Sequence, residues 1–180
     1  RIDDRDRISV YPKFETLDIA SLSRLSGRPL RTIRFILDVH LGKLSRYLRL
    51  CGFDTLYDNA YEDHQIVQLA SQQKRIILTR DIGILKHGDV QHGYWIRSDQ
   101  PHQQVREVIR RFDLKDQVNL FSRCLECNGE IVPASKDSVK HLLQEETLKY
   151  SDSFYQCKKR KKISWKGSHY QHMIEQTHHI

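Results

Sequence analysis

The sequence predicts an α/β protein with a parallel β-sheet, followed by a small C-terminal domain of a different kind. Short, bounded apolar runs at 33–37 and 76–78 are typical of strands that are buried on both faces of a parallel sheet. Segments with helical apolar spacing alternate with such runs, and this alternation favours parallel strands joined by right-handed crossovers. From about residue 121 the apolar runs shorten and cysteines appear, so we place a domain boundary near residue 120.

The predicted elements follow one another closely along the first part of the chain. After the strand at 33–37, a helix is expected over 41–51, because Leu41, Leu44 and Leu48 fall on one face, and Gly52 would end it. The remaining elements expected before residue 120 are a strand at 53–57, a helix from Asp63, a strand at 76–78, a short helix near 83–86, a strand at 94–96 and a helix from Pro101. Outside this part we expect a strand at 8–11 and a helix over 138–149.

Two aspartates, Asp38 and Asp81, each lie directly downstream of a predicted buried strand. Ligand-binding and catalytic groups gather at the carboxyl ends of the strands in open parallel sheets. Two carboxylates at that edge would repel each other unless a cation bridged them, and oxygen ligands suit Mg²⁺ or Mn²⁺. Asp63 is the third candidate ligand, because it lies at a helix N-terminus three residues before the core-facing Ile66.

Each of these aspartates also has a purely structural interpretation. Asp63 and Asp81 could equally be N-caps of the helices that follow them, and Asp38 could be a turn residue at a strand end, which is the less favoured interpretation for it. If the three carboxylates converge on one divalent ion, the chemistry is phosphodiester hydrolysis. The metal then lowers the pKa of a bound water and neutralises charge on the phosphate.

The charge of the chain points to an anionic partner, with nucleic acid first. The net charge is +7, yet residues 35–120 carry 12 basic against 11 acidic side chains, so the positive surplus lies in the flanks. Near the predicted carboxylates, Lys43, Arg46 and Arg80 could hold an RNA backbone, although an ordinary solvated face is equally consistent. The basic run at 158–162 is either a phosphate-contacting patch or a generic solvated segment.

Three of the four cysteines are grouped late in the chain. Cys124, Cys127 and Cys157 suggest metal binding in a reducing compartment, and hence a cytoplasmic location, because no secretory signal is visible. Cys51 reads as an ordinary buried thiol. No stretch approaches the roughly 18 apolar residues that a membrane helix needs, so no membrane partner is expected.

Four separated motifs resemble, in order, those of the Mut-seven C-terminal RNase domain, a PIN-like nuclease family. The resemblance covers roughly residues 32–175. The matching segments are Phe35 to Thr55 (FILDVHLGKLSRYLRLCGFDT), Arg75 to Asp81 (RIILTRD), Ser122 to Asn128 (SRCLECN) and Trp165 to Tyr170 (WKGSHY).

The resemblance implies a PIN-like three-layer α/β/α fold with a parallel sheet and an appended zinc ribbon. It implies metal-dependent endoribonuclease activity on RNA, with the acidic ligands of Mg²⁺ or Mn²⁺ at Asp38, Asp63 and Asp81. A fourth acidic position has no clear counterpart, and Asp99 is the one candidate for it. The implied domains are 32–120 for the nuclease and 121–180 for the zinc-ribbon-like part. They follow residues 1–31, of which 5–18 resemble the exit of a truncated ubiquitin-like domain.

The zinc ribbon departs from the family pattern at one ligand. Cys124 and Cys127 form the first knuckle, but the second has only Cys157, because Arg160 occupies the fourth ligand position and a guanidinium cannot bind Zn²⁺. Three outcomes are open. His169 or His172 replaces the missing ligand, three thiolates bind zinc weakly with a water, or the site holds no metal. A weakened or absent site is favoured.

Two other functions compete with the nuclease. One is a catalytically weak RNA-binding or adaptor module, which the damaged knuckle makes worth considering. The other is a phosphotransfer domain with Asp38 as nucleophile, which ranks well below the others. Phosphatases of that kind need a second carboxylate two residues on, and His40 stands there.

Overall fold

The computed structural model describes residues 33–167, 171, 174 and 175, all but the first of them in the unit that spans Arg34–Ile180. The predicted strand at 8–11 and the ubiquitin-like segment lie outside the described residues. None of the described helices is both long and apolar enough to cross a membrane.

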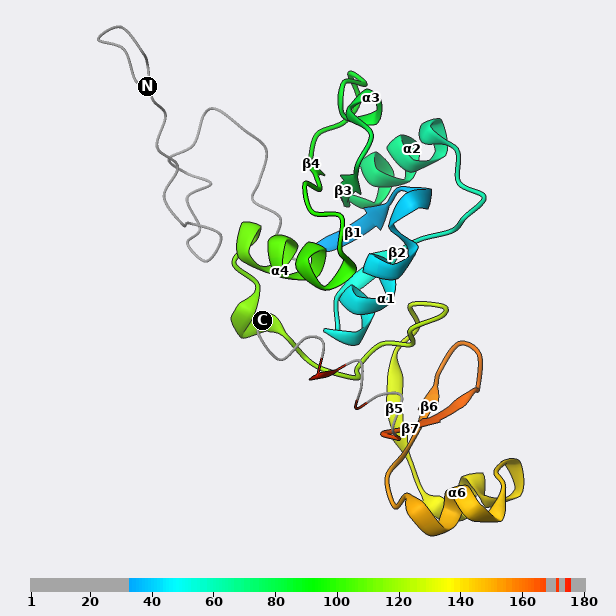
Figure 1. The fold of residues 1–180 in the computed structure, drawn as a ribbon. Coiled ribbons are helices and arrows are strands. Elements are labelled where there is room, and N and C mark those ends of the chain that lie inside the picture. Colours follow the sequence, from blue (N-terminus) through cyan, green and yellow to red (C-terminus); the bar gives the residue numbers. More distant parts are fainter. Residues whose placement is uncertain (1–32, 168–170, 172–173, 176–180) are drawn as a thin grey trace, which may run out of the picture. The chain divides into compact units, whose positions relative to one another are not determined.

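The larger sheet consists of four parallel strands in the order β2-β1-β3-β4 (Figure 1). The predicted fold class, mixed α/β with a parallel sheet, is therefore confirmed. The central strands are the two apolar runs, because each is buried along nearly all of its length. The strands are β1 (Arg34–Leu37), β2 (Asp54–Leu56), β3 (Ile76–Thr79) and β4 (Gly93–Trp95).

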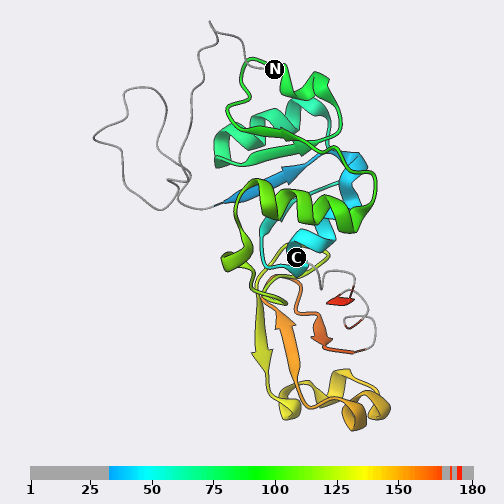
Figure 2. The same cartoon turned by 60° about the vertical axis from the view of Figure 1, so that its left-hand side comes forward.

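Helices cover both faces of this sheet, as Figures 1 and 2 show. Helices α1 and α4 contact each other on one face, and α2 packs against β1 and β3 on the other. The helical elements here are η1 (Val39–Leu41), α1 (Gly42–Leu50), α2 (Asp63–Gln73), α3 (Ile82–Leu85), α4 (Pro101–Arg111) and η2 (Lys115–Gln117).

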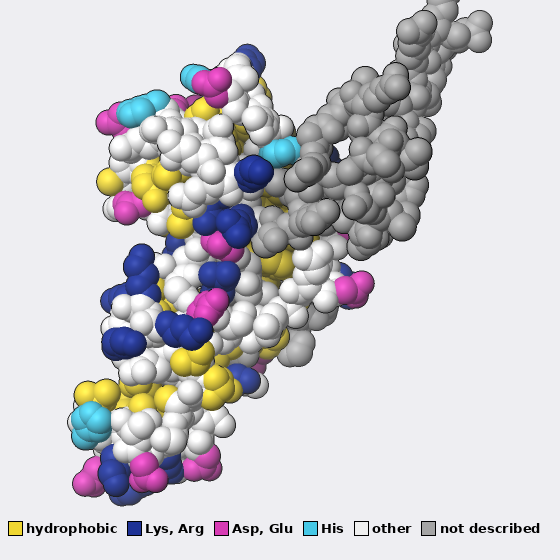
Figure 3. All heavy atoms as spheres, turned by 180° about the vertical axis from the view of Figure 1, so that it is seen from behind, with side chains coloured by type: hydrophobic (Ala, Val, Ile, Leu, Met, Phe, Trp, Pro, Cys, Tyr) yellow, Lys and Arg dark blue, Asp and Glu magenta, His cyan; other side chains and the backbone are white. Residues whose placement is uncertain are grey.

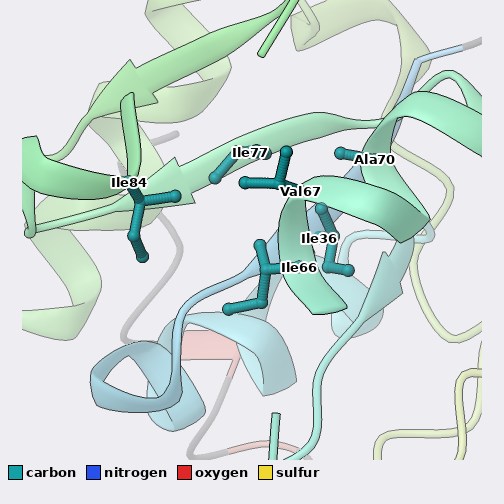
Figure 4. Close-up of a cluster of buried hydrophobic side chains, with 6 residues drawn as sticks. All are labelled: Ile36, Ile66, Val67, Ala70, Ile77 and Ile84. Atoms are coloured by element: carbon teal, nitrogen blue, oxygen red, sulfur yellow. The ribbon is translucent and has the colours of Figure 1, made fainter. Parts of the chain in front are cut away.

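The two faces of the sheet bury alternate residues of the same strands, as the two-residue period of a strand requires. Ile36 and Ile77 pack with the apolar stripe of α2 and with α3 (Figure 4). Phe35, also fully buried, contacts the ring of Phe112 at the end of α4. Helices on both faces thus explain why the strands read as continuous apolar runs. The cluster in Figure 4 comprises Ile36, Ile66, Val67, Ala70, Ile77 and Ile84.

The N-cap of helix α2 lies one residue before the predicted one. Glu62, not Asp63, is the N-cap, and it forms a capping box with Gln65, whose Oε1 accepts the backbone N–H of Glu62 at 3.0 Å. The reciprocal pair satisfies two donors at once, so Glu62 is the better cap. Asp63 is therefore the first helical residue, and the N-cap interpretation of Asp63 was wrong.

A three-stranded antiparallel sheet, in the order β5-β6-β7, forms the C-terminal part of the unit. Its strands are β5 (Ile131–Ala134), β6 (Phe154–Cys157) and β7 (Ile163–Trp165). The helix predicted over 138–149 is wrong as a single element. Instead α5 (Lys136–Val139), η3 (Lys140–Leu142) and α6 (Glu145–Tyr150) follow one another. The chain is extended at Leu143 and Gln144, which lets Leu143 pack against Val139, Phe154 and Ile163.

The edge strand β2 is held by a polar network centred on Asp54. Its Oδ1 accepts hydrogen bonds from the buried Arg75 Nη1 and from Asn128 Nδ2, both at 2.7 Å. The Thr55 backbone N–H donates to Asn128 Oδ1 at 2.9 Å, so Asn128 satisfies an edge donor of the sheet. Burial opposes ionisation of Asp54, but the hydrogen bonds from Arg75 and Asn128 outweigh it and lower the pKa of this carboxyl.

Replacing Asp54 with Asn should lower the free energy of unfolding at pH 7 by about 2 kcal/mol, because it leaves Arg75 buried without its counter-charge. The midpoint of thermal unfolding should fall by about 6 °C. A depressed carboxyl pKa contributes stability above the unfolded value and loses it at lower pH. The difference between parent and variant should therefore shrink as the pH drops below about 4.

The exposed Asp116→Asn is the matched control, and it should leave the midpoint unchanged. A difference between parent and Asp54→Asn that stays constant from pH 7 to pH 3 would contradict the electrostatic explanation. Calorimetry across this pH range makes the measurement.

Candidate active site and cysteine cluster

Asp38 lies at the carboxyl end of β1, directly beside the end of β3. The parallel register pairs Leu37 with Leu78, and the Asp38 backbone N–H donates to Leu78 O at 3.1 Å. This register places the fully buried Thr79 next to Asp38, and Thr79 Oγ1 donates to Asp38 Oδ2 at 2.9 Å. Asp38 Oδ1 accepts a longer bond from the His40 backbone N–H at 3.4 Å.

Asp81 reaches the same edge through the same threonine. Its backbone N–H donates to Thr79 Oγ1 at 2.8 Å, so the Thr79 hydroxyl joins the two predicted ligands. The Asp81 side chain also caps α3, since Oδ1 accepts the Gly83 N–H at 2.6 Å. The cap interpretation of Asp81 is thus confirmed. The side chain remains exposed, with its second oxygen making no hydrogen bond to a described residue.

Asp63 is exposed in the first turn of α2. No hydrogen bond or ion pair among the described residues joins it to Asp38 or Asp81. Within the described part of the chain, the one group of three or more Cys, His, Asp or Glu side chains close enough to share a metal ion is made of cysteines. The gathering of all three aspartates around one ion therefore stays a prediction.

The predicted basic residues differ in their surroundings. Lys43 and Arg46 are exposed on α1. Arg80 pairs with the carboxylate of Asp99, the residue considered as a fourth acidic ligand, and its carbonyl accepts the Trp95 Nε1–H at 3.1 Å. Arg80 and Asp99 thus neutralise each other beside the edge that carries Asp38 and Asp81.

The carboxyl-end edge fits a divalent cation. Asp38 is only 3% exposed, and it forms no ion pair with any described Lys or Arg. A buried carboxylate costs free energy unless a cation compensates it. Two carboxylates at one edge are the oxygen ligands that Mg²⁺ and Mn²⁺ prefer.

Thr79 is the site residue that sequence analysis missed. Its hydroxyl fixes one oxygen of Asp38 and accepts the backbone N–H of Asp81. The available signal was a hydroxyl residue at the end of a buried apolar run, two positions before a predicted ligand.

The three late cysteines do meet. The sulfur atoms of Cys124, Cys127 and Cys157 all lie within 4.8 Å of one another, and those of Cys127 and Cys157 are 3.4 Å apart. The Arg160 backbone N–H donates to Cys157 Sγ at 3.4 Å. Burial raises the pKa of the Cys127 thiol to about 11. Burial also opposes ionisation of Cys157, but the N–H of Arg160 and the neighbouring thiol lower its pKa.

Arg160 occupies the fourth position of the knuckle without offering a ligand. Its guanidinium pairs instead with Glu126, which also accepts a bond from Lys162 Nζ at 2.7 Å. His169 and His172, the possible substitutes, lie outside the described residues. The donor set thus fits a thiophilic ion such as Zn²⁺ with three protein ligands.

The knuckle is also attached to the larger sheet. The buried Arg49 of α1 donates to Thr55 O at 3.0 Å, and its Nη1 donates to the carbonyls of Leu125 and Glu126 at 2.9 and 3.0 Å. These carbonyls lie between the first two cysteines. The conformation of the cysteine loop is therefore fixed by Arg49 of α1, with or without a metal.

Two aspartates at the carboxyl edge of a parallel sheet stand where open α/β folds place their ligand-binding and catalytic groups. The sequence profile of the Mut7-C RNAse domain matches residues 33–177, and the chain belongs to this family. It is 32% identical over 122 residues to the human protein named "Exonuclease mut-7 homolog". That match covers 64% of this chain but only 14% of the human protein. No solved structure matches the chain significantly.

Replacing Arg160 with Cys should strengthen zinc binding by on the order of a hundredfold, because it completes a four-thiolate tetrahedral set. The parent should hold zinc loosely and give it up to a moderate chelator. A competition titration with a zinc-sensitive chromophore, in the presence of reductant, measures both affinities.

Cys51→Ser is the matched control, because Cys51 is buried away from the cluster and should not change zinc affinity. A parent protein that retains a full equivalent of zinc against the chelator would mean that a fourth ligand is already present.

Proposed function

We propose that this protein hydrolyses phosphodiester bonds of RNA in a metal-dependent, endonucleolytic reaction at the carboxyl edge of its parallel sheet. Membership of the Mut7-C RNAse domain family supports a nuclease. The observation that carries metal dependence is the buried carboxylate of Asp38, which is oriented by Thr79 and lacks a cationic side chain among the described residues.

In this proposal Asp38 and Asp81 hold Mg²⁺ or Mn²⁺, and Asp63 completes the set from α2. When bound, such an ion supplies an activated water and neutralises charge on the phosphate. Thr79 keeps Asp38 in one rotamer by its hydrogen bond of 2.9 Å, so the ligand geometry is set before the metal arrives. Lys43, Arg46 and Arg80 would contact phosphates on either side of the bond that is cut.

The endonucleolytic mode is supported by the openness of the edge. Asp63, Asp81 and the preceding Arg80 are all exposed, so an internal phosphodiester can approach without a chain end being threaded in. The human relative is named an exonuclease, and this chain spans 14% of its length. A further part of the proposal is a division into a nuclease domain over 32–120 and a zinc-ribbon-like domain over 121–180, in a cytoplasmic protein with free cysteines.

Asp38→Asn and Asp81→Asn should each reduce Mn²⁺-dependent cleavage by roughly a hundredfold or more while leaving RNA binding intact, because a neutral amide is a poor ligand for a hard cation. The substrate is a closed circular single-stranded RNA, whose conversion to a linear form reports internal cleavage. Asp116→Asn, which removes an exposed carboxylate elsewhere, is the control and should cut like the parent.

If the circle stays intact while linear RNA is shortened from one end, the endonucleolytic mode is wrong. If both variants cut as fast as the parent, the reaction does not use this edge. Binding without any cleavage by the parent would support the second candidate function, a catalytically weak RNA-binding module. Two observations favour that candidate: the knuckle is incomplete, and among the described residues the three aspartates do not form a group close enough to share one ion.

Thr79→Val should lower kcat about tenfold and raise the Mn²⁺ concentration needed for half-maximal rate, because Asp38 and the Asp81 backbone both lose their hydrogen-bond partner. Thr79→Ser retains the hydroxyl and should restore most of the rate. Equal rates for the valine and serine variants would show that the hydroxyl has no positioning role. Steady-state kinetics over a range of metal concentrations distinguishes these outcomes.

A further inference from the structure

A groove with a cavity of about 700 Å³ runs between the end of β4 and helix α4, and we call it the α4 groove. Four arginines line it, with one carboxylate and one tyrosine among them. They are Arg97, Arg106, Arg110, Arg111, Glu107 and Tyr94. None of these residues belongs to the motifs that carry the family resemblance, and none was predicted as a site residue.

The positive charge of the α4 groove is not neutralised by its carboxylate. Glu107 Oε1 accepts the Tyr94 hydroxyl at 2.9 Å and the Arg97 backbone N–H at 3.0 Å, and Oε2 accepts the Ser98 N–H at 3.0 Å. Partial burial opposes ionisation, but these backbone hydrogen bonds lower the pKa of Glu107 and keep it charged. The carboxylate thus anchors the end of β4 to α4 and forms no ion pair with an arginine of the groove.

The arginines lack acidic partners within the described part of the chain. Arg106, Arg110 and Arg111 form no ion pair there, and Arg106 Nε is buried without a hydrogen-bond acceptor. Guanidinium groups without acidic partners suit an anionic ligand that brings acceptor oxygens, although the buried Nε of Arg106 is itself out of reach of such a ligand.

Aromatic rings hold two of the guanidinium groups in place. The guanidinium carbon of Arg97 lies 5.6 Å from the centre of the Tyr94 ring and 5.9 Å from that of the Trp95 ring. Arg97 Nη1 also donates a hydrogen bond to the Tyr94 hydroxyl at 2.7 Å. Arg111 lies 5.6 Å from the same tyrosine ring. Guanidinium groups that are already oriented lose less side-chain entropy when they bind phosphates.

The α4 groove begins beside the candidate active site. The parallel register pairs Thr79 of β3 with Trp95 of β4. Asp81 follows Thr79 by two residues and Arg97 follows Trp95 by two residues, so both lie at the same edge of the sheet. Trp95 is 37% exposed, and its indole N–H is fixed on the carbonyl of Arg80. An exposed aromatic ring between a carboxylate edge and an arginine groove is the arrangement by which proteins bind single-stranded nucleic acid, with bases stacked and phosphates paired.

We propose that the α4 groove is a binding track for single-stranded RNA. In it Arg97, Arg106, Arg110 and Arg111 contact successive phosphates and Trp95 stacks a base next to the cleaved bond. The proposal deepens the proposed function, on which it rests for the identity of the ligand. It adds a positioning surface on α4 to the contacts expected from Lys43, Arg46 and Arg80.

The basic run at 158–162 is less suited to this role than the α4 groove. Lys158 pairs with Glu130 at 2.6 Å, and both Arg160 and Lys162 pair with Glu126. The face seen in Figure 3 likewise shows acidic side chains between the Lys and Arg side chains at its middle. Contacts to phosphate there would first have to break these pairs.

The test compares Arg110→Gln/Arg111→Gln with a control pair of the same charge change, Lys140→Gln/Lys149→Gln, both exposed lysines of the C-terminal part. The probe is a short fluorescent oligouridylate, titrated by anisotropy over a range of salt concentrations without added Mg²⁺ or Mn²⁺. Two lost phosphate contacts should reduce the slope of log Kd against log salt by about 1.4 and weaken binding roughly tenfold. Arg110→Lys/Arg111→Lys should retain most of the slope.

The binding assay needs no turnover, so it is independent of whether the carboxylate edge proves catalytic. An unchanged slope in the glutamine variant, or an equal loss in the lysine control, overturns the proposal. If the glutamine variant binds RNA with an unchanged Kd, the proposal is also overturned, and the groove would then suit a protein ligand instead. Equal midpoints of thermal unfolding for all variants ensure that the fold is retained.

A second measurement does not depend on substitution. Photo-crosslinking of the parent with an oligouridylate that contains 4-thiouridine should label peptides that include Tyr94, Trp95 and α4. Labelling confined to other peptides contradicts the track.

Discussion

The register between β1 and β3 is the constraint on which the candidate site depends. Pairing Leu37 with Leu78 brings Asp38 beside Thr79, and the same threonine receives the backbone of Asp81. A shift by one residue would turn every side chain of a strand to the opposite face. It would exchange Ile36, which packs with α2, and Phe35, which packs against Phe112, so the packing on the two faces also fixes the position of the carboxylates. Packing of the core and placement of the acidic edge are thus one requirement.

A second polar network joins this sheet to the cysteine loop. Asp54 binds Arg75 and Asn128, and Arg49 binds carbonyls of the loop between Cys124 and Cys127. Buried groups of this kind are costly when one partner is lost, and they specify a single arrangement when all are satisfied. The network explains how a knuckle with only three cysteine ligands can keep its conformation. In a complete zinc ribbon the metal both folds the loop and is bound by it. Here the polar network can hold the loop in place, so folding of the loop does not require the metal.

The net charge of +7 does not show which basic side chains are paired with acidic ones and which are not. The most conspicuous basic segment of the sequence, 158–162, is largely paired with Glu126 and Glu130. The arginines of α4, scattered in sequence among apolar core positions, converge on one groove with little acidic compensation. A run of lysines in the sequence is therefore a weaker guide to uncompensated positive charge than a helix with one apolar and one arginine-rich face.

The sequence by itself determined the α/β class, the order of the elements up to residue 111, the two edge aspartates and the cysteine knuckle with its missing ligand. These features depend on local periodicity and on residue type, which a single sequence records directly. It did not determine the role of Thr79, the capping of α2 by Glu62, the break at Leu143 or the groove along α4. Each of these depends on which residues far apart in the chain become neighbours, such as Thr79 with Asp38 or Leu143 with Phe154. Only the tertiary structure decides those contacts, because strand register and core packing select them from many alternatives of similar local propensity.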